Sequence, residues 1–112
     1  MRIKELVKKS HENAVDKGFW DNWVWIKRDR LQGHTEHYYN AINTNLLEIV
    51  REVTEAMEGL RRGDMDNFKE ELADTVIWIA DLCGGLEIDL EEEIRKKMRI
   101  NKERAYKHGK MF

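Results

Sequence analysis

Two pairs of carboxylates are the residues in this sequence whose types and spacing favour chemistry. Glu52 and Glu55 are three residues apart in one predicted helix, and Glu71 and Asp74 repeat that spacing in the next. Residues at i and i+3 share a helix face. If the two faces meet, each pair of charges about 6 Å apart repels by roughly 2–3 kcal/mol at an effective dielectric near 20. The spacing therefore predicts a hard divalent cation with oxygen ligands, Mg²⁺ or Mn²⁺.

The alternative is that both acidic stripes are solvated surface. Two observations favour a site. Neither stripe carries a cation between its paired acids, although a solvated helix face usually alternates charges. Trp78 also lies within the second stripe, where an indole suits the wall of a polar pocket or an oligomer interface better than open solvent.

Lys97, Asn101 and Arg104 share one face of a further predicted helix, and apolar residues lie on the same face. One interpretation is that the cations snorkel to solvent or pair with the acidic stripes. The other is phosphate binding, with Arg104 as a fork and Lys97 as a point charge. No G-x-x-x-x-G-K-[ST] loop is present, which excludes a P-loop enzyme.

The segments EVTEA, EELAD and LEIDLEEEIRKKMRINKERAYKHGK resemble the MazG-type nucleoside triphosphate pyrophosphohydrolases of the all-α superfamily. The resemblance covers residues 40–110 and rests on E-x-x-E, E-x-x-D and K-x-x-x-N-x-x-R in that order. It implies attack of water on the α-phosphorus of a nucleotide, with release of pyrophosphate. It also implies that the four carboxylates hold Mg²⁺ and that the triphosphate is held by Lys97, Asn101 and Arg104.

The same resemblance implies a base pocket. Trp78, one turn after Asp74, matches an aromatic wall in related pyrophosphatases, and the further candidates are Asp81, Trp20 and Tyr106. The sequence departs from the family at Arg51, where many members carry a second acid, and at Thr54, where glycine is common. The run HENAVDKGFW is similar to the leader of short, single-domain members.

The elements that must position these groups are predicted from apolar periodicity to be helices over residues 2–17, 40–62, 66–86 and about 89–106. Gly84 and Gly85 are expected to weaken the end of the third. Residues 19–39, with Trp20, Trp23 and Trp25, have no clear period and suit a loop with a short helix. Their tryptophans either stack on a base or bury an oligomer interface, and the interface is favoured.

One domain is predicted over residues 1–112, with an N-terminal helix and Trp-rich segment (1–39), catalytic helices (40–106) and a tail (107–112). The expected fold is an all-α, four-helix-type bundle protomer. A chain this short buries only about two thirds of its surface, so a homodimer or homotetramer is expected. The absence of proline and the presence of only seven glycines argue against a loop-rich all-β fold.

Charge and apolar content exclude several classes of partner. The net charge of −2 argues against a binder of nucleic-acid polymers. The longest apolar stretch, residues 76–83, contains Asp81 and is too short to cross a membrane.

The sequence opens without an apolar h-region, so no signal peptide is expected. The single cysteine, Cys83, fits a reducing cytoplasm.

Three rival functions stay open at this stage. A ferritin-like di-metal protein needs E-x-x-H motifs, which the sequence lacks. A non-catalytic helical interaction module and a phosphoribosyl-ATP pyrophosphatase are the others. His34 and His37 form an H-x-x-H without further ligands nearby, which favours an exposed loop over a metal site.

Overall fold

The computed structural model describes residues 1–111 and confirms an all-helical fold in which this part of the chain contains no strand. The Trp-rich segment holds a short helix, and the predicted helix 40–62 begins earlier, at residue 36. The elements are α1 (Ile3–Asp16), α2 (Trp23–Leu31), α3 (Glu36–Arg61), α4 (Met65–Gly85), α5 (Leu90–Lys102) and a 3₁₀ turn, η1 (Tyr106–Gly109).

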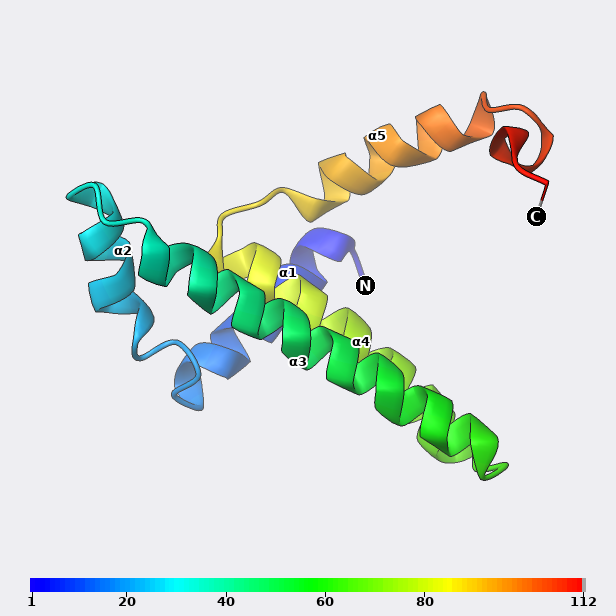
Figure 1. Cartoon of the computed structure of the whole chain (residues 1–112), viewed down its shortest axis with the longest axis horizontal. Helices are drawn as coiled ribbons and strands as arrows, with labels where there is room; N and C mark the ends of the chain where they lie inside the picture. Colours follow the sequence, from blue (N-terminus) through cyan, green and yellow to red (C-terminus); the bar gives the residue numbers. More distant parts are fainter. Residues whose placement is uncertain (112) are drawn as a thin grey trace.

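The centre of the molecule is the antiparallel hairpin of α3 and α4, which make the most extensive contact of any two elements (Figure 1). Gly63 allows the tight turn between them, because its φ of 73° lies in the left-handed region that favours glycine. Asp64 then caps α4 by accepting a hydrogen bond from the backbone N–H of Asn67 at 3.0 Å. The hairpin therefore sets the acidic motifs of α3 and α4 side by side.

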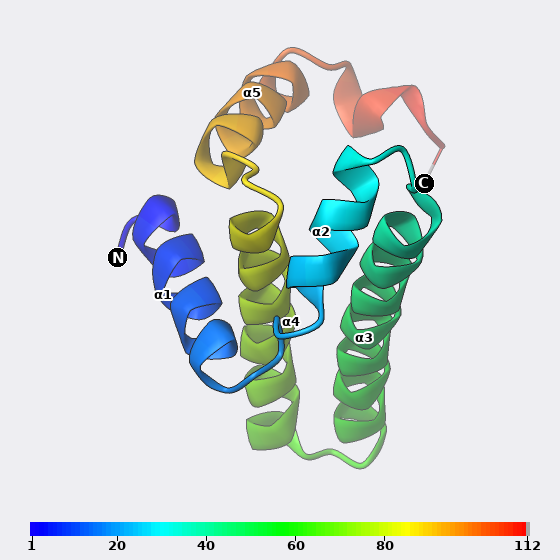
Figure 2. The same ribbon diagram turned by 90° about the vertical axis from the view of Figure 1, so that its left-hand side faces the viewer.

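Helix α1 packs along the C-terminal half of α4, so that α1, α4 and α3 form a layer with α2 on one face (Figure 2). The core cluster lies where α2 meets this layer, and its buried members are Trp20, Trp23, Ile26, Tyr38 and Leu82. The expected oligomer interface is therefore wrong for Trp20 and Trp23. Both indoles are buried within the chain itself, since the layer supplies the apolar surface that they need.

Helix α4 continues through Gly84 and ends at Gly85, where the sequence predicts that these two residues of low helix propensity weaken it; Gly84 is half-buried and Gly85 is buried. Their role is close approach. A Cβ on Gly84 would lie 2.6 Å from the Cβ of His11, and a Cβ on Gly85 would overlap the six-membered ring of Trp20. Glycine at these positions lets α1 and the Trp20 ring pack directly against the α4 backbone.

Helix α5 ends at Lys102, so the predicted extension to Tyr106 is wrong. Ala105 adopts an extended conformation after it, which separates α5 from the 3₁₀ turn. In both views α5 projects away from the α3–α4 hairpin, and its main contact is with α1 (Figures 1 and 2). Within residues 1–111 the chain thus lacks a completed four-helix bundle. None of its described helices combines the length and apolarity needed to span a membrane.

Candidate active site

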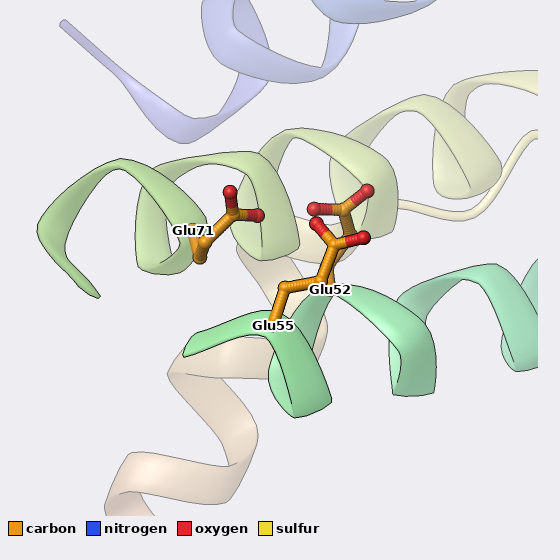
Figure 3. A group of neighbouring side chains, drawn as sticks. All are labelled: Glu52, Glu55 and Glu71. Carbon is orange, nitrogen blue, oxygen red and sulfur yellow. The ribbon is translucent and has the colours of Figure 1, made fainter. Parts of the chain in front are cut away.

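Glu52, Glu55 and Glu71 converge between α3 and α4 (Figure 3). Each offers a carboxylate oxygen, and these oxygens all lie within 4.8 Å of one another. Glu52 is buried, Glu71 is half-buried and Glu55 is exposed, so the cluster opens to solvent on one side. Three of the four predicted metal ligands are therefore gathered in one place, and we call them the acidic cluster.

The acidic cluster is electrostatically strained. The pKa of Glu71 is raised above its usual value, first by a hydrogen bond with Glu52, then by burial and by the charges of Glu52 and Asp74. The second oxygen of Glu71, Oε2, is buried without a hydrogen-bond partner in the described chain. A hard cation would satisfy this oxygen and relieve the repulsion, so the donor set fits Mg²⁺.

Asp74, the fourth predicted ligand, is exposed and lies outside the group of oxygens within 4.8 Å. It lies one turn after Glu71 on α4, close enough for its charge to raise the pKa of Glu71. Its role as a metal ligand stays a prediction.

Arg51 brings a positive charge to the acidic stripe of α3, although it does not lie on that stripe by helical spacing. Its guanidinium lies 3.1 Å from Glu48 and 3.9 Å from Glu52. Helical spacing does not predict these contacts, because adjacent residues such as Arg51 and Glu52 point about 100° apart around the helix axis. Only a long side chain spans that angle. Its side chain is mostly exposed, so these ion pairs contribute little stability and leave the guanidinium free to exchange partners.

A cavity of about 570 Å³ lies beside the acidic cluster, between α2, α3 and α4. Its volume is typical of small-molecule sites. Three of the predicted base-pocket residues, Trp20, Trp78 and Asp81, line it, whereas Tyr106 is almost fully exposed in the C-terminal turn. The other lining residues are Phe19, Asn22, Trp23, Ile26, Ala41, Thr44, Asn45, Glu48 and Arg51.

The cavity and the acidic cluster are adjacent along both helices. Glu48 and Arg51 line the cavity, and Glu52 follows Glu48 by one turn, about 6 Å along the axis of α3. On α4, Trp78 follows Asp74 by one turn. The arrangement suits a ligand with a planar part in the cavity and an anionic part that reaches the cluster through a bound cation.

A model of the MazG nucleotide pyrophosphohydrolase domain matches residues 40–108 of the chain. The chain belongs to this family. The match spans the acidic cluster, all of the cavity-lining residues on α3 and α4, and all of α5. It confirms the resemblance seen in the acidic motifs. No curated protein and no solved structure matches the chain.

The basic residues of the MazG domain are not brought to the acidic cluster within one chain. Lys97 and Asn101 are exposed on α5, and Arg104 follows the helix end instead of continuing its face. Within residues 1–111 of the single chain these residues neither pair with the acidic stripes nor reach the cluster to hold a triphosphate there, because α5 projects away from α3 and α4 (Figure 2).

Two residues that contact the cavity wall, His11 and Phe19, precede the matched MazG domain and could not be predicted from the acidic motifs. His11 contacts Asp81, and Phe19 pairs edge-on with Trp78 at the cavity. The available signal was the Gly84–Gly85 pair, which marks a place where another element approaches α4 closely.

His34 and His37 line a separate polar hollow at the start of α3, and neither belongs to a metal-binding group in residues 1–111.

Proposed function

We propose that this protein is a Mg²⁺-dependent pyrophosphohydrolase that cleaves (deoxy)nucleoside triphosphates into a monophosphate and pyrophosphate. The observation that carries the proposal is the acidic cluster: three carboxylates with oxygens within 4.8 Å and a buried Glu71 oxygen without a partner. A family of nucleotide pyrophosphohydrolases and an adjacent cavity of suitable size support it.

In this proposal the acidic cluster of Glu52, Glu55 and Glu71 holds the metal ion, with Asp74 as the fourth ligand and Mn²⁺ as a substitute for Mg²⁺. The bound ion supplies charge neutralisation on the phosphate oxygens. Glu55, the most exposed carboxylate of the cluster, in addition orients or deprotonates the attacking water in this proposal. Phosphoryl chemistry needs mainly positioning and charge stabilisation, which this constellation is suited to provide.

We also propose that the enzyme is a homo-oligomer in which α5 of another subunit completes the site. No large side chain in residues 1–111 is fully buried, so the single chain leaves much apolar surface uncovered. Exposed apolar residues form a stripe on each helix of the hairpin, Leu46, Val50, Val53, Met57 and Leu60 on α3, and Met65, Leu72, Val76 and Ile79 on α4.

Around each helix axis, the apolar stripe is rotated from the carboxylates by about 140°, in the same sense when each helix is viewed from its own N-terminus. Because α3 and α4 are antiparallel and their carboxylates face each other, this rotation brings both stripes to the same side of the hairpin. We call it the apolar hairpin face, and a second copy presents the same apolar surface to it. Helix α5, which carries Lys97, projects away from the α3–α4 hairpin of its own chain (Figure 1). Lys97 and Arg104 are both exposed, and their positive charge complements the acidic cluster of a partner subunit.

Met57→Lys is expected to dissociate the oligomer, because it places a charge in the middle of the apolar hairpin face. Sedimentation-velocity analysis should show wild type as a dimer or tetramer and Met57→Lys as a monomer with little activity. Glu70→Lys, an exposed change on α4, is the control and should leave the assembly intact. A wild-type protein that sediments as a monomer contradicts the proposed assembly.

Mixing two inactive variants tests whether α5 acts across subunits. Glu71→Gln and Arg104→Ala should each lose activity alone. After unfolding and refolding together, about a quarter of wild-type activity should return, because half of randomly paired dimers are mixed and each mixed dimer has one intact site. If the mixture stays inactive while each variant assembles normally, α5 serves its own chain.

The proposed reaction is tested by a pyrophosphate-release assay over the common ribo- and deoxyribonucleotides, with and without Mg²⁺. Turnover should require the metal. Phosphoribosyl-ATP belongs in the panel, since its preferential cleavage favours the rival pyrophosphatase. An interaction module without catalysis is expected to bind no Mg²⁺–nucleotide in calorimetry and to turn over none of the panel.

The setting we propose is the cytoplasm, where such an enzyme removes unwanted nucleotides from the pool. The single cysteine fits this setting: Cys83 is a free thiol in the buried end of α4, and burial raises its pKa. A protonated, buried thiol is a packing residue and takes no part in the proposed hydrolysis.

A further inference from the structure

The cavity beside the acidic cluster contains a buried carboxylate, Asp81, that the hydrolytic reaction does not use. Asp81 lies on α4 and its side chain is only 7% exposed. Among residues 1–111, the side chains of His11 and Trp20 lie within hydrogen-bond distance of this carboxylate. A carboxylate taken out of water is costly unless hydrogen bonds compensate it, so its donors decide what it does.

Both protein donors reach the same oxygen of Asp81. The indole Nε1–H of Trp20 donates to Oδ1 at 2.8 Å, and Nδ1 of His11 lies 3.0 Å from Oδ1. Since an ionised carboxylate only accepts, the compatible form of His11 is the one that carries a proton on Nδ1. These bonds, from α1 and from the segment before α2, fix the orientation of the carboxylate.

The other oxygen, Oδ2, has no hydrogen bond from any of the described residues, and Asp81 lines the cavity. If Asp81 served only to accept hydrogen bonds from Trp20 and His11, a neutral side chain with one acceptor oxygen would be enough. A fixed carboxylate with its second oxygen unpaired therefore suits a ligand that brings its own N–H donor.

The cavity also provides surfaces for a flat ligand. The rings of Phe19 and Trp78 meet edge-on with centroids 6.2 Å apart, and both line the cavity together with Asp81. Phe19 is 65% exposed, which is unusual for a large aromatic side chain and typical of a stacking platform. A planar ring stacked there would present its edge toward Asp81.

We propose that Asp81 recognises the exocyclic amino group of the substrate's nucleobase, so that the enzyme prefers amino-bearing bases to their oxo counterparts. This inference rests on the proposed nucleotide pyrophosphohydrolase function and names the substrate class of that site. An amino group donates a hydrogen bond to Oδ2. A carbonyl at the same ring position faces the carboxylate with a second acceptor and leaves both unpaired.

Two matched pairs of substrates test the proposal, because each pair differs at the amino position and its adjacent ring nitrogen while the ring size is unchanged. The pairs are dCTP against dUTP and dATP against dITP. Wild-type kcat/KM should favour the amino member of each pair by about tenfold to a hundredfold, the range expected for a hydrogen bond to a charged group.

Asp81→Asn should reduce or invert both ratios. The two donors hold the amide oxygen in the place of Oδ1, so the amide nitrogen takes the place of Oδ2 and donates to a carbonyl. Asp21→Asn is the matched control: it makes the same change of charge at an exposed site outside the cavity lining and should leave both ratios unchanged. Circular dichroism checks that both variants fold.

Binding of dCMP and dUMP without metal, followed by tryptophan fluorescence, separates recognition from hydrolysis. Tighter binding of dCMP that Asp81→Asn reverses supports the proposal, even if no triphosphate is hydrolysed and the hydrolase function fails. Equal wild-type binding and equal kcat/KM within each pair overturn it, whatever the variant does. A wild-type preference that Asp81→Asn leaves intact in a folded protein also overturns the role of Asp81.

Discussion

Glu71→Gln is expected to abolish pyrophosphate release, with kcat/KM lower by at least about a hundredfold, while the metal-free protein becomes more stable to heat. The two effects have one cause. Glu71 carries the partnerless oxygen that fits a cation, and its charge is repelled by Glu52 and Asp74 when no cation is present. The amide removes the repulsion and the metal ligand together.

The pH dependence of the metal-free protein has a definite sign. The pKa of Glu71 is raised in the folded state, so its contribution to stability is fully present below the unfolded pKa. That contribution is lost as the pH rises through the raised folded value. The melting temperature of the metal-free wild type should therefore fall as the pH rises from the unfolded pKa of Glu71 through its raised folded pKa. In Glu71→Gln this fall should be smaller.

Thermal unfolding with and without Mg²⁺ measures the loss of metal binding and the gain in metal-free stability in Glu71→Gln, and the pyrophosphate-release assay measures the loss of activity. Mg²⁺ should raise the melting temperature of wild type and leave that of the variant unchanged. Glu70→Gln is the control, since it removes an adjacent, exposed carboxylate that lies outside the acidic cluster. A variant that keeps full activity, or still gains stability from Mg²⁺, contradicts the assignment of Glu71.

Gly85→Ala should destabilise the fold by up to about 2 kcal/mol, because an added Cβ overlaps the buried ring of Trp20. Overpacking costs about 1–3 kcal/mol, and the better helix propensity of alanine offsets roughly 1 kcal/mol of that. The melting temperature should fall by several degrees. Displacement of Trp20 should also break its 2.8 Å bond to Asp81 and loosen the cavity.

A double-mutant cycle identifies the cause of that loss. Trp20→Phe removes the outer atoms of the indole that an alanine at position 85 would meet. The combined variant should therefore be more stable than the sum of the single effects predicts, as measured by urea unfolding. Additive losses would mean that Gly85 acts through something other than the Trp20 ring.

The acidic motifs predicted the reactive part of the site because their information is local. An i,i+3 spacing on each of two adjacent helices and a short turn at Gly63 suffice to bring Glu52, Glu55 and Glu71 together. Asp74 has the same spacing but lies more exposed. Its oxygens lie outside the acidic cluster, which spacing along a helix cannot predict because it does not determine the rotamer of a side chain.

The cavity was harder to predict because it depends on contacts between distant segments. Asp81 accepts bonds from His11 and Trp20, far away in the sequence, and no periodic pattern links these positions. The Trp-rich segment looked like an interface because the sequence does not show which apolar surface covers an aromatic ring. The direction of α5 was missed since its amphipathic pattern fits a partner subunit as well as its own bundle.

The measurement that tests the central claim most directly is ³¹P NMR of the products formed from dCTP and Mg²⁺ in ¹⁸O-labelled water. The products should be dCMP and pyrophosphate, with the label in dCMP, because water attacks the α-phosphorus. Omission of Mg²⁺ should stop the reaction. Release of inorganic phosphate, label in the pyrophosphate, or undiminished turnover without metal would contradict a Mg²⁺-dependent pyrophosphohydrolase at the acidic cluster.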